Sequence, residues 1–223
     1  MAAPRQFSPM FAYLVSQKHD GIIGRDVGST LAGGLKAAME DGSCPAEVFP
    51  YPNPVRYSPT IPSGAFEAAK QFKIGRHTVC RSYQDVFDFL ASGQGGVEIG
   101  IRWPEEWMEC NGVVERYAVG YGGGGHAVAF LGYSRRVDSQ GRKYLWLANS
   151  WGREWGVDGY AEVAPAAVDQ MAQHQDTAMI GLSDMAVDDV RPRDVSWIGD
   201  GSVFLPRANP QPKIGPVKTT LAL

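Results

Sequence analysis

Three β-rich segments in the second half of the chain constrain the fold more than any other feature. They cover residues 126–133, 143–149 and 159–163, and turns separate them. A fourth segment, residues 97–101, alternates apolar residues with charged or small ones, as a strand with one buried face does. Because these short strands follow one another with turns between them, the sequence predicts a mostly antiparallel sheet.

Helical patterns come before and among these strands. Residues 8–15 predict a short helix with Ser8 as its cap, because a serine hydroxyl accepts an otherwise unpaired N–H of the first turn. Residues 29–42 predict an amphipathic helix, and residues 82–93 predict a third. The proline-rich residues 45–62 predict an extended surface connection. Helices followed by mostly antiparallel strands indicate the α+β class.

The composition excludes several classes of protein. The 223 residues carry a formal net charge of −3 at pH 7, which is too mild for a basic nucleic-acid surface. No apolar run approaches the roughly 18–20 residues that span a bilayer. Residues 1–6 also lack the apolar core of a secretory signal. We therefore expect a soluble chain that binds neither nucleic acid nor a membrane.

The cysteines and histidines do not predict a metal site. Cys44, Cys80 and Cys110 are an odd number of thiols, so a fully paired disulfide framework within one chain is excluded. The sequence has no CxxC pair, and its four histidines lack metal-ligand spacing. We expect no metal and no cofactor, with the thiols reduced and buried or with one bridge at most.

The last forty residues differ in character from the rest. Residues 184–223 contain several prolines and no helical or strand periodicity. One interpretation is an extended tail laid over the domain surface. The alternative is a docking peptide for another subunit, because Trp197, Ile198, Phe204 and Leu205 are costly to leave in water.

Three motifs stand in order across the β-rich half. They are Gly-His-Ala-Val at His126, Asn-Ser-Trp-Gly beginning 23 residues later at Asn149, and Trp-Gly-Val-Asp-Gly-Tyr at Trp155. Together they resemble the papain family of cysteine peptidases, as do residues 7–9 and 49–51 upstream. The resemblance covers about residues 7–183. It implies a two-lobe papain-like domain, with an incomplete helical lobe over about residues 1–95 and an antiparallel β-rich lobe over about residues 96–183.

The resemblance also implies roles for these residues. His126 would be the base that takes a proton from a nucleophilic thiol, and Asn149 would hold the imidazole toward the sulfur. Trp151 would shield that hydrogen bond from water, and Trp155 would line the leaving-group side of the site. Each residue alone would more often be ordinary packing, but their order and spacing together favour the catalytic interpretation. The expected ligand is an extended peptide substrate, or a protein partner, between the lobes.

The nucleophile of such a site is not evident. In this family the cysteine lies roughly 130–150 residues before the histidine, which places it at or before residue 1 here. The chain has no CGxCW sequence and no matching upstream glutamine. Cys44, Cys80 and Cys110 are poor candidates by position. A different alignment sets Pro9 at the cysteine position, with Ser8 beside it.

These observations leave three hypotheses open. The first is a cysteine peptidase whose cysteine segment lies upstream of this chain or in a partner. The second is an inactive papain-like homologue that serves as a structural or interaction module, its tail docking on other subunits. The third is another enzyme, such as an acyltransferase, that uses the same His–Asn pair. The chain as it stands is predicted to be inactive.

Overall fold

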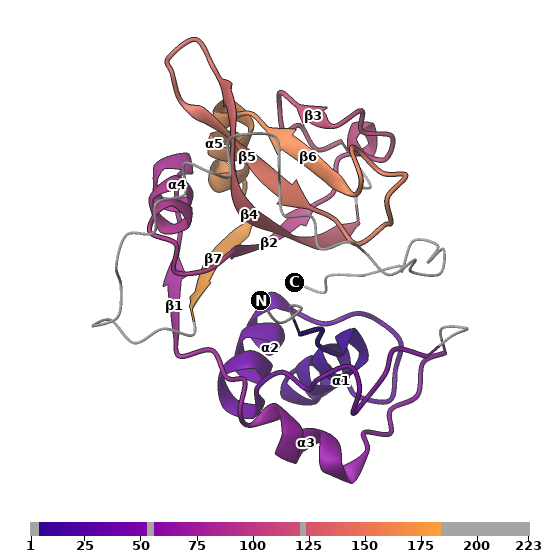
Figure 1. Ribbon diagram of the computed structural model, residues 1–223. Helices are drawn as coiled ribbons and strands as arrows, with labels where there is room; N and C mark the ends of the chain where they lie inside the picture. The colour runs from indigo at the N-terminus through magenta and orange to yellow at the C-terminus, as the bar shows by residue number, and fades with distance from the viewer. Residues whose placement is uncertain (1–4, 53–55, 121–123, 184–223) are drawn as a thin grey trace. The chain divides into compact units, whose positions relative to one another are not determined.

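The computed structural model describes residues 5–52, 56–120 and 124–183. They form two compact units, a helical one over residues 5–76 and a sheet-based one over residues 77–183 (Figure 1). The units divide between Arg76 and His77, whereas the sequence predicts a division near residue 95. The difference is helix α4 (Tyr83–Ala91), which packs on the sheet of the second unit. The predicted tail lies outside the described residues.

The helical unit contains α1 (Pro9–His19), α2 (Leu31–Lys36) and α3 (Ser63–Ala69). As predicted, Ser8 caps α1, because its Oγ accepts the N–H of Phe11 at 3.0 Å. Thr30 caps α2 in the same way, and a π-helical turn, η1 (Ala37–Asp41), continues it to Gly42. Helix α3 was not predicted from the sequence. None of the described helices is long and apolar enough to cross a bilayer.

The helical unit buries both large and small apolar side chains. The large ones are Met10, Phe11, Leu14 and Val15 of α1 and Leu31 of α2, and the small ones are Ala37, Cys44, Ala65 and Ala69. Gly42 allows η1 and α3 to approach closely, because a Cβ at this position would lie 2.1 Å from the carbonyl oxygen of Ala69. Helix α1 therefore supplies most of the large buried side chains in the described part of this unit.

The second unit is built on one seven-stranded sheet with the strand order β1-β7-β2-β4-β5-β6-β3. The pairs β7–β2, β2–β4, β4–β5 and β5–β6 are antiparallel, and β3–β6 is parallel. These strands confirm the α+β class and the four predicted strands. The bounds are β1 (Arg76–Val79), β2 (Val97–Arg102), β3 (Val113–Val114), β4 (Gly125–Val137), β5 (Lys143–Ala148), β6 (Tyr160–Val163) and β7 (Ala178–Ser183).

Two helices cover this sheet (Figure 1). Helix α4, capped by Ser82 as predicted, contacts β2, β4 and β7, and α5 (Pro165–Gln173) contacts β5 and α4. Gly181 of β7 leaves room for Phe89 of α4, since a Cβ there would lie 2.7 Å from the ring. A short 3-10 turn, η2 (Glu105–Trp107), follows β2. One continuous apolar core runs through the unit.

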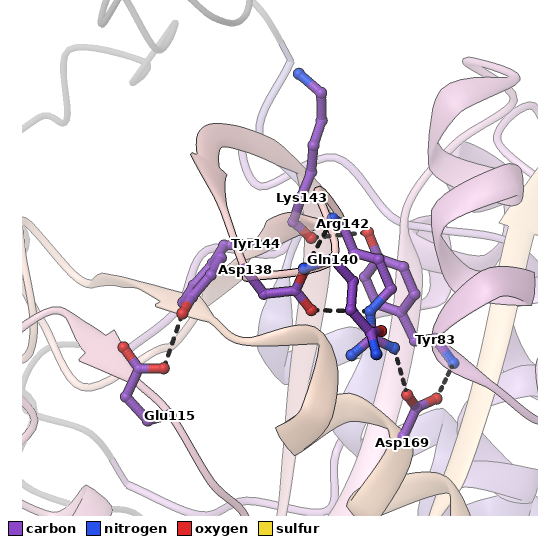
Figure 2. A network of polar contacts seen from close by, with 8 residues as sticks. All are labelled: Tyr83, Glu115, Asp138, Gln140, Arg142, Lys143, Tyr144 and Asp169. Carbon is purple, nitrogen blue, oxygen red and sulfur yellow. Dashed lines mark hydrogen bonds and ion pairs between the residues drawn. The ribbon is translucent and has the colours of Figure 1, made fainter.

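The hairpin between β4 and β5 is tied to both helices by a polar network (Figure 2). The Asp138 carboxylate accepts the backbone N–H groups of Gln140 and Arg142, both at 2.9 Å, and the Arg142 Nε at 2.8 Å. Arg142 also donates to Asp169 of α5 at 2.9 Å. Asp169 in turn accepts the N–H of Tyr83 at the start of α4. Arg142 therefore links the hairpin to the helical layer.

We expect Arg142→Ala to lower the free energy of unfolding by about 1–2 kcal/mol, because two charge-assisted contacts are lost in a partly buried place. The matched control is Arg153→Ala, whose pair with Asp158 is more exposed, at 66% and 42% of the two side chains, and is expected to cost less than about 0.5 kcal/mol. Urea unfolding followed by tryptophan fluorescence measures this, because five of the six tryptophans lie in the second unit. Equal effects of the two substitutions would exclude the structural role of Arg142.

Candidate catalytic site

His126 and Asn149, the two predicted catalytic residues, are in direct contact. His126 is the second residue of β4, lies opposite Ile101 of β2, and is buried. Asn149 follows the last residue of β5, where its N–H donates to the Gly159 carbonyl at 3.0 Å. The Nε2 of His126 lies 2.8 Å from the Oδ1 of Asn149. The sheet therefore brings together two residues that are 23 positions apart.

A second hydrogen bond determines which ring nitrogen carries the proton. The N–H of Ser150 donates to Oδ1 of Asn149 at 2.8 Å, so this atom must be the amide oxygen and an acceptor. Nε2 of His126 must then be the donor to it. In the neutral imidazole, Nδ1 consequently keeps its lone pair and is the nitrogen that can accept a proton.

Trp151 packs directly on His126, whereas Trp155 packs on Trp151. The indole of Trp151 lies 4.8 Å from the imidazole centroid at 33° to its plane. Trp155 is one ring further away, 6.4 Å from Trp151, and its Nε1 donates to the Trp107 carbonyl at 2.7 Å. The turn that follows requires Gly156, which has φ +61°; a Cβ there would lie 2.1 Å from the Tyr160 carbonyl oxygen.

Trp103 is a further neighbour of His126, and it lies outside the three motifs of the sequence. Its ring centroid lies 4.8 Å from the imidazole, with the planes at 87°. The pattern that would have found it is the strand alternation itself. The buried face formed by Val97, Ile99 and Ile101 continues to Trp103, which is also buried.

The imidazole of His126 is held in an environment that disfavours charge. Burial lowers its pKa, and the hydrogen bond with Asn149 acts in the opposite direction but is the weaker of the two influences. His126 is therefore neutral at neutral pH, with Nδ1 available as a base.

Two buried donors at this site have no acceptor among the described residues. They are the indole N–H of Trp103 and the Nδ2 amide of Asn149. Leaving such a donor unpaired costs about 1–3 kcal/mol. Both donors belong to residues that contact His126. The polar groups around His126 are therefore not fully satisfied within the described part of the chain.

The alternative nucleophiles are engaged elsewhere. Burial raises the pKa of all three thiols above its ordinary value. The hydrogen-bond partners of Cys44, Cys80 and Cys110 are backbone groups at Pro45, Thr78 and Gly112. Ser8 belongs to the helical unit, where its oxygen caps α1. Among the described residues no thiol is hydrogen-bonded to His126, and no group of three or more potential ligand side chains could hold a metal ion.

A family model described as "Papain family cysteine protease" matches residues 51–181, which is more than half of the chain. The chain belongs to the papain family. Its fold is also that of the family: xylellain, a cysteine protease from Xylella fastidiosa, superposes with a TM-score of 0.66 at 20% identity, over 83% of this chain and 73% of that one. The bromelain protease from Ananas comosus gives a TM-score of 0.56 at 17% identity, over 82% and 79%.

The curated papain-family relatives are longer than this chain. Cathepsin B-like CP2 of Giardia intestinalis is 27% identical over 161 residues, which cover 70% of this chain and 52% of the relative. Cathepsin B-like protease 1 of Arabidopsis thaliana is 32% identical over 95 residues, 43% of this chain and 24% of the relative. The chain therefore matches about half or less of the length of these two relatives.

We expect the stability of this papain-family chain to depend on pH through His126. The pKa of His126 is lowered in the folded chain, while in the unfolded chain it is about 6.5, so below that pH the unfolded chain binds a proton that the folded chain does not. The stabilising contribution of the neutral ring is present above about pH 6.5 and is lost as the pH falls toward the folded pKa.

The matched variant is His126→Gln, which shares every other titrating group with the wild type. The free energy of unfolding of both proteins is measured in urea at about pH 7.5 and about pH 5. Between the two pH values, the wild type should lose more of this free energy than the variant does. A difference that stays constant over this range, or moves in favour of the wild type, would contradict the buried neutral imidazole.

Proposed function

We propose that His126 and Asn149 are the base and the orienting residue of a papain-type cysteine peptidase site whose thiol comes from outside these 223 residues. The observation that carries this proposal is the direction of the hydrogen bonds. Ser150 fixes the amide of Asn149, the amide holds Nε2–H, and Nδ1 is left as the proton acceptor.

The proposed reaction follows from that arrangement. Nδ1 takes the proton of a cysteine thiol, and the thiolate forms a C–S bond to the carbonyl carbon of an extended peptide substrate. The imidazolium then gives its proton to the leaving amine as the C–N bond breaks. Water, deprotonated by the neutral imidazole, hydrolyses the resulting thioester and regenerates the thiol. Trp151 keeps solvent away from the His126–Asn149 hydrogen bond, and Trp155 supports it through Trp151.

Two further features support a thiol from another segment or a partner chain. A nucleophilic cysteine needs a lowered pKa, whereas burial raises that of each thiol described here. The unpaired donors beside His126 also favour a site to which a further polypeptide contributes acceptors.

The alternative is an inactive papain-family homologue that acts as a structural or interaction module. The absence of a suitable thiol among the described residues favours it as well. The proposed docking of residues 184–223 on other subunits belongs to this alternative, and those residues lie outside the described part of the chain.

The chain alone should neither cleave peptides nor react with a thiol-directed peptidyl epoxide at Cys44, Cys80 or Cys110. The same chain joined to a papain-family segment that carries the glutamine and the CGxCW cysteine should be labelled at that cysteine. His126→Ala should then reduce peptide cleavage at least about 100-fold. The control is His77→Ala, because His77 is exposed on β1 and should leave cleavage unchanged.

Two results would redirect the assignment. If the joined chain folds but is neither labelled nor active, the inactive homologue is the better description. If the 223-residue chain alone cleaves peptides and loses this activity on His126→Ala, the nucleophile would have to lie within the chain. Cys80→Ser, Cys110→Ser and Ser8→Ala would then identify the nucleophile.

A further inference from the structure

Trp103 stands beside His126 because of the register between β2 and β4. Ile101 lies directly opposite His126 in this antiparallel pair. Trp103 is two residues beyond Ile101, on the same face, and its N–H donates to the Gly124 carbonyl at 2.8 Å. The antiparallel pairing therefore continues through Trp103, whose side chain becomes the diagonal neighbour of His126.

The three rings of Trp103, Trp151 and His126 form a nearly equilateral triangle. Their centroids are 4.8 Å apart for each indole–imidazole pair and 5.1 Å apart for the two indoles. Trp103 and Trp151 therefore contact adjacent sides of the imidazole and not opposite ones. Trp151 is tilted by 33° from the imidazole plane, whereas Trp103 meets it at 87°.

The neighbours of Trp103 fix its position in turn. Trp107 lies 5.3 Å from it and donates its indole N–H to the Arg116 carbonyl at 3.3 Å. Trp155 lies 5.8 Å from it and donates to the Trp107 carbonyl. The indole N–H of Trp103 has no acceptor among the described residues, so its side chain is held there by packing without a hydrogen bond of its own. Among the indoles of the described residues, it is the one in contact with His126, Trp107, Trp151 and Trp155 together.

We propose that Trp103 is a positioning residue for His126: its indole blocks the side of the imidazole that Trp151 and Asn149 leave open, and so fixes the direction of Nδ1. The inference rests on the proposed function in treating His126 as the base. Three contacts then restrain one ring: the hydrogen bond at Nε2, the indole of Trp151 at 33° to the ring plane, and the indole of Trp103 at 87° to it. Arg102, the nearest charged residue on β2, belongs to the other face of the strand and pairs with Asp176.

Nuclear magnetic resonance of the imidazole Cε1–H groups in the full chain tests this without requiring catalysis. His126→Gln identifies the His126 signal among the four histidines. In Trp103→Leu we expect the pKa of His126 to rise toward about 6.5, because water reaches the imidazole. The chemical shift of its Cε1–H should also lose the ring-current contribution of the Trp103 indole. Trp103→Phe, which keeps an aromatic ring, should restore most of both properties.

The matched control is Trp107→Leu, since Trp107 is equally buried and contacts Trp103, but is not in ring contact with His126. It should change the His126 pKa by less than about 0.2. If Trp103→Leu does not fold, the pair Trp103→Met and Trp107→Met gives the same comparison, with the larger shift expected for Trp103→Met. Equal shifts in the Trp103 and Trp107 variants, or none in either, would overturn the inference. A chain that passes this test but, when joined to the cysteine-bearing segment, folds and is not labelled by the epoxide would refute the proposed function alone.

Discussion

Strand β4 pairs with β2 along one edge and with β5 along the other, and these two registers position the candidate site. The first places Ile101 opposite His126, and hence Trp103 beside it. The second pairs Ala129 with Ala148, so Asn149 leaves β5 one residue later and within hydrogen-bonding distance of His126. A shift of one residue in either register would turn the side chain concerned to the other face of the sheet. The geometry around the imidazole is therefore a property of the sheet, and the network of Arg142 at the far end of the same hairpin stabilises it.

The parts of the fold that could be predicted from sequence are those with a local cause. Ser8 and Ser82 each begin a helix through a capping hydrogen bond, and the alternation of apolar residues predicts β2. His126 and Asn149 were recognisable because the order and spacing of the three motifs that contain them resemble those of the papain family. Other features depend on pairing between distant segments. Strand β7 (Ala178–Ser183) was missed because a six-residue segment that contains Gly181 becomes a strand only through its partners β1 and β2. Trp103 was missed because it lies beyond the alternating residues 97–101, and also beyond the end of β2 at Arg102.

The three thiols illustrate how burial separates structural from nucleophilic cysteine. A thiolate is stabilised by a neighbouring positive charge or by several donors, and is destabilised by an apolar surrounding. Cys44 lies in the core of the helical unit, and Cys80 lies in the core of the sheet unit. Cys110 accepts the N–H of Gly112, which lowers its pKa, but burial has the larger and opposite effect. In each case the neutral thiol is the stable form, and the side chain contributes to packing.

The burial of His126 also explains why its surroundings suit a negatively charged neighbour such as a thiolate. Burial beside two tryptophans, Trp103 and Trp151, and in the sheet lowers the pKa of the imidazole, so the ring alone remains neutral. A thiolate next to Nδ1 would reverse this, because an opposite charge in a water-poor site stabilises the imidazolium more strongly than it would in solvent. Asn149 assists without competing, since a neutral amide orients Nε2–H and adds no second negative charge. An aspartate in its place would hold the positive charge by itself and weaken the attraction to sulfur. The buried, hydrogen-bonded, uncharged imidazole is thus suited to become charged only when a thiol gives up its proton to it.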